Sequence, residues 1–318
     1  MSAVLLRLFG VLLMLSAVAI ALSRAPDRPV QALVARWGLP PSDFIEVKGQ
    51  LVHLRDEGPR GDPQPVLLLH GTGASLHTWD GWVAALKARH RVIRIDLPGF
   101  GLTGPFSGSY PADDYRGDTY ARFVLDLLDA LAVPRAVIGG HSLGGEVAWR
   151  AVALAPQRFA KLILVDATGY AVEPDEIPLG LRIAGLPLAS RIGEYLLPRA
   201  LVAASLRSVY GDPSRVDDEL VDRTFELTLR EGNRRALGLR LQQLEAGEHA
   251  ARIKTLALPT LVLWGGRDRL VPPAAARRFA GDIRGAKLML FDGLGHLPHE
   301  EDPARSVAVV ANFLEPEP

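Results

Sequence analysis

The stretch Gly140-His141-Ser142-Leu143-Gly144 lies between two different sequence patterns. Before it, the apolar run at 136–138 is typical of a buried strand, and after it residues 145–154 predict a helix without an internal breaker. A serine at the centre of such a junction sits on a strained bend that exposes its hydroxyl. The flanking glycines are needed because a side chain at either position would collide with the neighbouring strand or helix. Ser142 is therefore a candidate nucleophile.

The same pentapeptide pattern also occurs in plain loops, so its meaning depends on partners elsewhere in the chain. A nucleophilic serine needs a base, and the base needs an orienting acid. His296 follows the predicted strand 286–291 in a glycine-rich loop, and Asp268 follows the buried-strand pattern at 260–264. Because the carboxyl ends of parallel strands meet at one edge of a sheet, we expect Ser142, Asp268 and His296 to converge there.

An acyl-transfer site also needs N–H donors for the oxyanion of its intermediate. The strand pattern at 66–69 leads into the glycine-rich turn at 70–73, which can aim the Thr72 N–H at the same place as the Leu143 N–H. Leu143 opens the helix behind the serine, where backbone N–H groups are free and the helix dipole is positive. Thr72 and Leu143 are therefore predicted to form the oxyanion hole.

At these positions the chain resembles the alpha/beta-hydrolase superfamily, from about residue 44 to about residue 314. The landmarks are the segments 70–73, 96–101, 140–144, 265–268 and 295–296. The resemblance implies that Ser142 is the nucleophile, His296 the base and Asp268 the orienting acid. It also implies that Thr72 and Leu143 are the oxyanion donors.

Short apolar runs alternate with helical stretches along most of the chain. This alternation predicts a mostly parallel sheet covered by helices on both faces. The runs are 66–69, 92–95, 136–138, 162–165, 261–264 and 287–291. Before them, the alternating segments 44–47 and 51–55 predict an antiparallel hairpin at the start of the sheet. The expected fold class is α/β, with an eight-stranded alpha/beta-hydrolase sheet.

The strand rhythm stops for too long between residues 168 and 253 to be a simple crossover. We predict a helical cap at 170–253, inserted between the two parts of the core at 43–169 and 254–318. Its expected helices are 180–184, 190–197, 199–208, 216–231 and 233–246. The cap should sit over the serine, and some of its apolar residues either shape an acyl or aromatic pocket or only join cap to core. These residues are Leu179, Ile183, Leu196, Leu197 and Phe225.

The N-terminal segment differs from the rest of the chain. Residues 8–22 carry no charge and, extended to residue 2, would form a helix of about 31 Å, enough for a hydrocarbon core of about 30 Å. We therefore predict a single-pass membrane anchor through residues 2–22 and a membrane-anchored location. The alternatives are an export signal cleaved near 19–21 and a merely buried helix. Residues 23–42 are expected to be a linker with a short helix at 30–37.

Composition excludes several classes of function. The 36 basic and 36 acidic residues balance, and no basic block suggests a nucleic-acid partner. Cysteine is absent, which excludes disulfides, thiolate catalysis and cysteine metal sites. The segment 99–104 matches half of a dinucleotide fingerprint, but Pro98 and Pro105 bracket it and no helix opens on it. The run 296–300 lacks a third spaced metal ligand. No cofactor and no metal are implied.

Several polar residues near these motifs have competing interpretations. Asp166 ends the strand pattern at 162–165 and is the rival acid, because in some relatives the acid comes from this strand. We favour Asp268, since its loop matches the acid loop of the family. Asp96 is expected to brace its loop. The histidines at 70 and 77 are expected to brace the oxyanion turn, and those at 141 and 299 to serve packing or hydrogen bonding.

The predicted activity is serine hydrolysis of carboxylic esters of small to medium apolar substrates through an acyl-enzyme intermediate. His296 would remove the Ser142 proton and later activate water. The alternative is a carbon–carbon bond hydrolase of ring-cleavage products, which would use the same triad and cap position. A serine at the bend argues against the dehalogenase and epoxide hydrolase relatives, whose corresponding residue is an aspartate. The expected partner is a small acyl substrate, and the oligomeric state is open, as is a non-enzymatic binding role for the fold.

Overall fold

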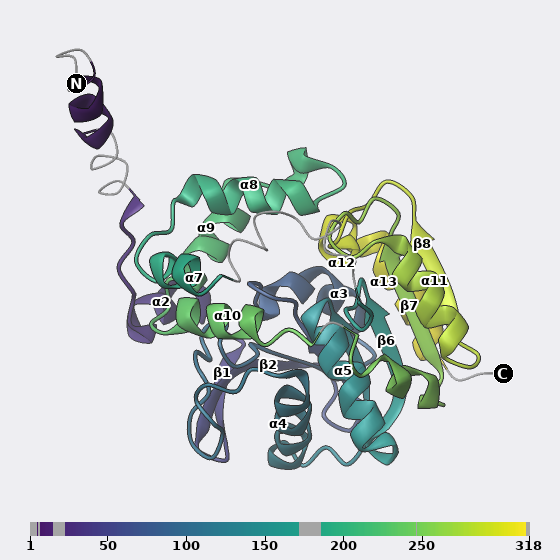
Figure 1. Cartoon of the computed structure of the whole chain (residues 1–318). Helices are drawn as coiled ribbons and strands as arrows, with labels where there is room; N and C mark the ends of the chain where they lie inside the picture. Colours follow the sequence, from purple (N-terminus) through teal and green to yellow (C-terminus); the bar gives the residue numbers. More distant parts are fainter. Residues whose placement is uncertain (1–4, 6, 15–22, 172–185, 246, 316–318) are drawn as a thin grey trace.

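A single sheet of eight strands organises the protein in the computed structural model, which describes residues 5, 7–14, 23–171, 186–245 and 247–315 (Figure 1). The strand order is β1-β2-β4-β3-β5-β6-β7-β8. The strands are β1 (Ser42–Val47), β2 (Gln50–Glu57), β3 (Val66–Leu69), β4 (Val92–Ile95), β5 (Ala136–His141), β6 (Phe159–Val165), β7 (Thr260–Gly265) and β8 (Lys287–Phe291). β2 runs antiparallel to β1 and β4, and all other pairs are parallel. The predicted fold class is confirmed.

Helices cover both faces of the sheet because its central strands are apolar on both sides. In β3, Leu67 and Leu69 pack into one core cluster with α4 (Gly117–Ala130), α5 (Leu143–Leu154) and α11 (Pro273–Asp282). Val66 and Leu68 point the other way, into a second cluster with α3 (Asp80–Leu86) and α13 (Pro303–Leu314). Fully burying each such side chain stabilises the fold by roughly 1.5–3 kcal/mol.

The residues between β6 and β7, which we call the insertion (170–253), are helical where the structure describes them. The helices are α7 (Pro187–Gly193), α8 (Arg199–Val209), α9 (Asp218–Thr228) and α10 (Asn233–Gln242), with 3-10 turns η3 (Pro213–Arg215) and η4 (Ala250–Thr255). Four predicted helices are therefore present with shifted ends. The fifth, 180–184, lies outside the described residues together with Leu179 and Ile183. α7 begins three residues earlier than predicted because Pro187 is accommodated in a first helical turn.

Residues 23–37 lie against the insertion (Figure 1). Backbone bridges join Arg24 to Leu196 and Arg28 to Arg230. The short helix α2 (Val30–Trp37) has the predicted bounds, and its Trp37 indole donates a 2.7 Å hydrogen bond to Glu226 in α9. The segment expected to be a linker is thus attached along its length. Backbone pairing of this kind leaves no periodic signature in the sequence.

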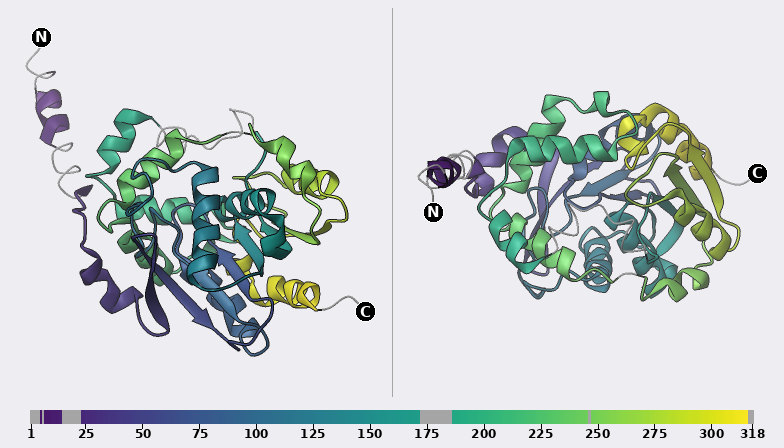
Figure 2. Two further views of the ribbon diagram at one scale, coloured as in Figure 1. Left: turned by 90° about the horizontal axis from the view of Figure 1, so that it is seen from below. Right: turned by 45° about the horizontal axis from the view of Figure 1, so that its top comes forward.

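The predicted membrane-anchored location is wrong. Of the predicted anchor, the structure describes residues 5 and 7–14, which are helical. Within the described residues, no helix combines the length and the apolar character that a membrane crossing requires. This short helix stands apart from the sheet and its covering helices in the views of Figure 2. The rest of the predicted anchor, including the possible cleavage site at 19–21, lies outside the described residues.

Two further short elements place residues of the site. The 3-10 turn η1 (Leu76–Trp79) follows the β3 turn and leads into α3. The helix α12 (Pro298–Glu301) follows the loop after β8 and leads into α13. Both elements lie at the carboxyl ends of parallel strands, the edge where ligands of open α/β sheets bind.

Candidate active site

Ser142 sits on a sharp bend between β5 and α5, with φ +52° and ψ −115°. A Cβ added at Gly140 would lie 2.1 Å from the carbonyl oxygen of Gly144. A Cβ added at Gly144 would lie 2.2 Å from the carbonyl oxygen of Leu69 in β3. Any residue larger than glycine would therefore force the helix or the strand to move. The predicted strained turn and its requirement for both glycines are confirmed.

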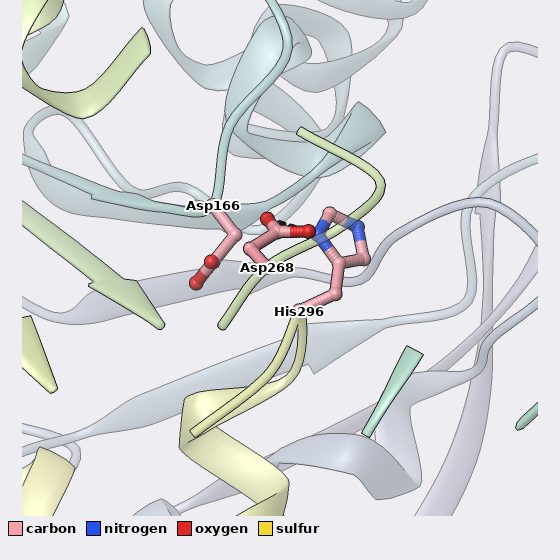
Figure 3. A group of neighbouring side chains, drawn as sticks. All are labelled: Asp166, Asp268 and His296. Atoms are coloured by element: carbon pink, nitrogen blue, oxygen red, sulfur yellow. Dashed lines mark hydrogen bonds and ion pairs between the residues drawn. The ribbon is translucent and has the colours of Figure 1, made fainter. Parts of the chain in front are cut away.

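Asp268 and His296 form a buried pair at the ends of β7 and β8 (Figure 3). The His296 Nδ1–H donates to Asp268 Oδ2 at 2.7 Å, while Asp268 Oδ1 accepts the N–H groups of Leu270 and Val271 at 2.7 and 3.0 Å. Burial would raise the pKa of the Asp268 carboxyl, but His296 and the N–H donors outweigh burial and hold that pKa below its usual value. The carboxylate is thus fixed in the ionised form that can orient an imidazole.

His141 connects the serine bend to the His296 loop. Its Nε2–H donates to the carbonyl oxygen of His296 at 2.8 Å, and the two rings lie 4.7 Å apart. Among the described residues no hydrogen bond joins the Ser142 hydroxyl to the His296 ring. Catalytic hydrogen bonds of this kind commonly tighten only when substrate binds. The three side chains from β5, β7 and β8 therefore lie at one edge of the sheet, with Asp268 and His296 already paired.

The two predicted oxyanion donors lie on adjoining turns. Leu143 is the first residue of α5, so its N–H has no acceptor within the helix. The β3 turn that carries Thr72 packs directly on the serine bend: a Cβ added at Gly71 would lie 3.0 Å from the Cβ of Ser142. This close packing brings the backbone of both turns beside the serine. The oxyanion role of Thr72 and Leu143 stays a prediction.

Asp96 braces the loops next to the site, as predicted. Its carboxylate accepts the N–H of Leu76 at 2.7 Å, the N–H of Leu102 at 2.8 Å and the Nδ1–H of His53 at 2.7 Å. A Cβ added at Gly101 would lie 2.1 Å from this carboxylate. The glycines that imitate a dinucleotide fingerprint therefore allow the chain to turn tightly around Asp96.

Two neutral histidines hold the turn after β3. His70 Nε2 accepts the Leu97 N–H at 2.9 Å, and its Nδ1–H donates to the Gly71 carbonyl at 2.7 Å. His77 accepts the Ser75 hydroxyl at 3.0 Å and donates to the carbonyl of Trp37 at 3.0 Å. Burial lowers the pKa of His70 and lowers that of His77 to about 4. Both rings brace this turn, as the sequence predicted.

Asp166, the rival acid, does not bond to the imidazole in the described structure. Its Oδ1 accepts the Gly265 N–H at 3.0 Å across the β6–β7 pair. Burial, and then the charge of Asp268, raise the pKa of Asp166 well above its ordinary value. One oxygen of each carboxyl group lies within 4.8 Å of the other, so two ionised carboxylates here would repel each other by roughly 3 kcal/mol or more at an effective dielectric constant of about 20. Asp268 is therefore the partner of His296.

Glu301, which the sequence did not single out, joins the His296 loop to the insertion. One carboxylate oxygen accepts the Gly295 N–H at 2.7 Å and the other accepts the Gly211 N–H at 2.9 Å. The backbones are close here, since a Cβ added at Gly211 would lie 2.3 Å from the Gly293 carbonyl oxygen. His296 itself donates its N–H to the Val209 carbonyl at 2.7 Å. In sequence Glu301 resembles an ordinary surface residue of a short helix.

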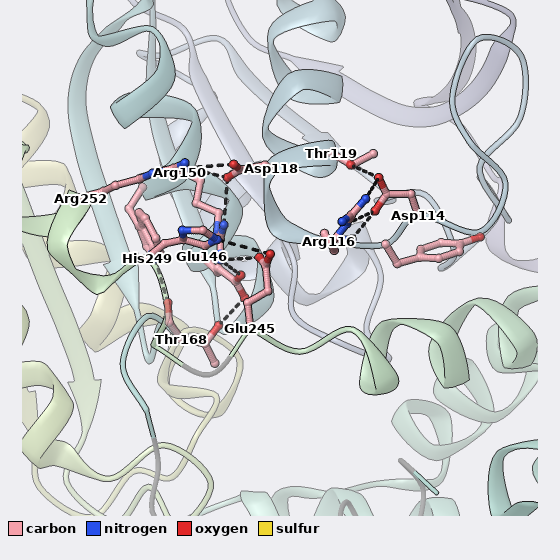
Figure 4. Close-up of polar contacts among 12 residues, drawn as sticks. Asp114, Arg116, Asp118, Thr119, Glu146, Arg150, Thr168, Glu245, His249 and Arg252 are labelled. Atoms are coloured by element: carbon pink, nitrogen blue, oxygen red, sulfur yellow. Dashed lines mark hydrogen bonds and ion pairs between the residues drawn. The ribbon is translucent and has the colours of Figure 1, made fainter. Parts of the chain in front are cut away.

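A buried ionic network links α10 to α5, the helix that begins behind Ser142. Figure 4 shows the part of this network around Glu146 and Arg150. Glu146, one turn after Ser142, accepts Arg240 at 2.6 Å and pairs with Arg150 at 3.0 Å. Arg150 also contacts Asp118 and Glu245, both at 2.9 Å. Glu146, Arg150 and Arg240 are each at most 5% exposed. Helical periodicity alone would place these charges on solvent-exposed faces, so the sequence reasoning missed them.

A narrow cleft lies beside the turn after β3, between the core and the insertion. Its lining residues are Gly73, Ala74, Gly99, Phe100, Gly101, Leu227, Thr228, Asn233 and Leu237. The predicted pocket residues Leu196, Leu197 and Phe225 are half-buried and do not line it. The apolar side chains from the insertion are instead Leu227 and Leu237, because the α9–α10 corner is the part that reaches this turn.

Two groups of side chains in the described ranges have donor atoms within 4.8 Å of one another. The first is Asp166, Asp268 and His296, in which the ring nitrogen and a carboxylate oxygen are already joined by a hydrogen bond. The second is Glu245, Glu248 and His249, which lies at the end of the ionic network. The first group is thus arranged for proton sharing. The expectation that no cofactor is needed stays a prediction.

Comparison with known proteins identifies relatives across most of the chain. A family model described as alpha/beta hydrolase fold matches residues 64–303. An uncharacterised protein of Mycobacterium tuberculosis is 30% identical over 270 residues, covering 80% of this chain and 76% of that protein. The 2-hydroxy-6-oxononadienedioate/2-hydroxy-6-oxononatrienedioate hydrolase of a Pseudomonas species is 28% identical, covering 86% of this chain and 96% of that protein.

Among solved structures, a meta-cleavage product hydrolase from Pseudomonas fluorescens matches with a TM-score of 0.73 and 27% identity. The match covers 85% of this chain and 96% of that chain. The matched range of the family model includes the serine bend between β5 and α5 and the residues of the Asp268–His296 pair. The chain therefore belongs to the alpha/beta-hydrolase family.

Proposed function

We propose that the protein is a serine hydrolase that cleaves a carbon–carbon bond next to a ketone, in substrates of the ring-cleavage-product type. The observation that carries the hydrolytic part is the 2.7 Å Asp268–His296 pair at the strand edge occupied by the strained Ser142 bend. The choice of bond is supported by three of the similar proteins, which are named a 2-hydroxy-6-oxononadienedioate/2-hydroxy-6-oxononatrienedioate hydrolase, a 2-hydroxymuconate semialdehyde hydrolase and a meta-cleavage product hydrolase. This order reverses the sequence-based preference for esters.

In this proposal His296 accepts the Ser142 proton as the serine oxygen attacks the ketone carbonyl. The N–H groups of Thr72 and Leu143 hold the resulting oxyanion, and the negative Asp268 stabilises the imidazolium. When the carbonyl re-forms, the carbon–carbon bond breaks and its electron pair leaves on the carbon conjugated to the second carbonyl. His296 returns the proton to the leaving fragment. It then activates water, which releases the acyl group from the serine.

Ester hydrolysis is the second candidate, and one observation favours it. None of the described residues that line the cleft carries a charge, and most are glycine or apolar. Such a lining suits an uncharged acyl group, since an anionic substrate would lose its hydration without gaining a charged partner. An ester needs only an alkoxide leaving group, which the same base can protonate.

Kinetics with two sets of substrates test the proposal. The purified chain is assayed with vinylogous diketones and with nitrophenyl esters of increasing chain length, and Ser142→Ala serves as the matched control. We expect kcat/KM for the best diketone to exceed that for the best ester by about tenfold or more, which corresponds to ~1.4 kcal/mol of transition-state binding. Faster ester turnover would replace the first candidate by the second. Equal fluorophosphonate labelling of wild type and Ser142→Ala would contradict both.

A further inference from the structure

Two carboxyl side chains meet at the ends of neighbouring strands, and the mechanism above uses only one of them (Figure 3). Asp166 follows β6 and Asp268 follows β7. Asp166 is fully buried and has a φ of +44°, a left-handed conformation that is costly for a non-glycine residue. The strained backbone turns its side chain into the interior, beside the acid of the pair. Strain at such a position persists only where surrounding contacts enforce it.

The oxygens of Asp166 have different environments. Oδ1 accepts the Gly265 N–H at 3.0 Å. Oδ2 is buried and has no hydrogen-bond partner in the part of the chain that the structure describes. An oxygen of each carboxyl group and a ring nitrogen of His296 lie within 4.8 Å of one another. A buried carboxyl oxygen without a partner is unfavourable as a bare acceptor, whereas a proton on it would let it donate to the nearby carboxylate.

The Asp268 carboxylate has room for one more donor. Its oxygens accept three hydrogen bonds, from Leu270, Val271 and His296. A carboxylate offers about four acceptor positions, so a fourth donor would complete it. The titratable groups that bear on Asp166 are Asp268 and Glu301, both of which disfavour a second negative charge. His296 is engaged by Asp268.

We propose that Asp166 is a positioning residue that keeps a proton on Oδ2 and shares it with the Asp268 carboxylate. The neutral Asp166 holds Asp268 in the orientation that serves His296, and it does so without adding a charge to the pair. The kinetic consequences rest on the proposed hydrolase function, whereas the protonation of Asp166 rests on packing alone. Burial and the neighbouring carboxylates raise the pKa of Asp166 in agreement with this arrangement.

Infrared spectroscopy tests the proton directly and needs no substrate. The difference spectrum between wild type and Asp166→Asn at neutral pH should contain one protonated-carboxyl stretching band that the variant lacks. Asp218→Asn is the matched control, because the Asp218 side chain is 87% exposed and its replacement should remove only an ionised-carboxylate band. If the Asp166→Asn difference also contains only the ionised-carboxylate band, the proposal is wrong, whatever the activity of the protein.

Kinetics of three variants test the positioning role. An asparagine side chain can accept the Gly265 N–H and donate to Asp268, so Asp166→Asn should lower kcat by no more than about threefold. Asp166→Ala removes both contacts and should lower kcat on the order of tens of times, because misplacement of a catalytic group by about 1 Å can cost ~100-fold. Asp268→Asn should lose far more than Asp166→Asn. If Asp166→Ala fails to fold, the comparison of the two asparagine variants still decides, because equal losses would overturn the proposal.

The pH profile gives a reading that a purely structural role would not change. A neutral Asp166 predicts that the acid limb of kcat/KM, or of the fluorophosphonate labelling rate, stays in place in Asp166→Asn. Asp166 and the His296 ring have atoms within 4.8 Å of one another. If Asp166 were ionised, removing its charge would therefore move that limb to lower pH by about one pH unit or more. Such a displacement would contradict the proposal. A protein that shows the infrared band but neither turnover nor labelling would contradict only the proposed function.

Discussion

The loops of the core around Ser142 and the helices of the insertion are held in place by different kinds of contact. In the core the decisive contacts are steric, such as the approach of Gly144 to the Leu69 carbonyl. The insertion is attached to the core by buried and partly buried ion pairs as well, such as Arg240–Glu146 and Arg223–Glu300. Steric contacts have one geometry, whereas paired charges can separate and rehydrate at a cost of a few kcal/mol. The core therefore defines the reacting geometry, and ion pairs help to position the insertion over it.

The largest effect should come from the acid of the core. Replacing Asp268 by asparagine removes the charge that stabilises the imidazolium and should lower kcat on the order of 10⁴-fold, with little change in folding. Steady-state kinetics and thermal unfolding measure both quantities. Asp218→Asn in the insertion is the control and should keep wild-type kcat, since its side chain is 87% exposed. If Asp268→Asn lowers kcat by less than about tenfold, another residue orients the imidazole.

Glycine substitutions compare the two regions sterically. Gly144→Ala places a Cβ 2.2 Å from a backbone oxygen and should destabilise the fold by about 3 kcal/mol or more. Gly193→Ala in α7 meets nothing within 4 Å and should stabilise it by about 0.5 kcal/mol, the gain of alanine over glycine in a helix. Denaturant unfolding of both variants provides the measurement. Similar changes in the two would remove the steric distinction drawn above.

Arg240→Met should break the ionic attachment of the insertion. The change leaves the buried Glu146 with Arg150 as its remaining cationic partner, and should lower the free energy of unfolding by about 3 kcal/mol. Because α10 then loses its tie to the helix behind Ser142, KM should rise more than kcat falls. Arg116 forms its ion pair on the surface, so Arg116→Met should change neither the free energy of unfolding nor KM. A stable Arg240→Met protein with unchanged KM would show that other contacts hold the insertion.

Acid pH should destabilise the fold because two buried histidines have lowered pKa values. Burial lowers the pKa of His77 to about 4 and that of His299 to about 3. Below pH 6.5 the unfolded chain takes up protons that the native rings refuse, so stability falls as the pH drops from 6.5 toward 4, by about 1.4 kcal/mol per pH unit for each ring. Between pH 7 and 4, the free energy of unfolding should depend less steeply on pH in His77→Gln than in the wild type. If the pH dependence is the same in His77→Gln and in the wild type, His77 does not contribute to the loss of stability at acid pH.

The smallest effect is expected where residues 23–37 meet the insertion. Arg36 pairs with Asp222 at 3.3 Å and with Glu226 at 3.1 Å, but its side chain is 49% exposed. Arg36→Ala should therefore lower the free energy of unfolding by less than about 1 kcal/mol, and added salt should reduce the difference further. Trp37→Phe, which removes a partly buried hydrogen bond to Glu226, should cost more. The reverse order would mean that surface charge holds this segment.

The parts of the fold that were predicted correctly are those with a local signature. Six apolar runs and one alternating hairpin pattern predicted the eight strands, and the glycines around Ser142 predicted the bend, because strand burial and turn geometry depend on neighbours in sequence. Asp268 was preferred over Asp166 from its loop, and the structure pairs it with His296. Helix ends in the insertion were less well predicted, since caps and tertiary contacts move them by a few residues.

The amino-acid sequence by itself determined the sheet, the order in which serine, aspartate and histidine reach its edge, and the glycines that make the bend possible. Only the tertiary structure decided which charges are buried and with whom: Glu146 with Arg240, 94 residues away, Glu301 with two backbone N–H groups, and Asp166 beside Asp268. The physical reason is range. Periodicity and turn chemistry act between neighbours in the chain, whereas the cost of burying a charge depends on partners that only folding brings within bonding distance.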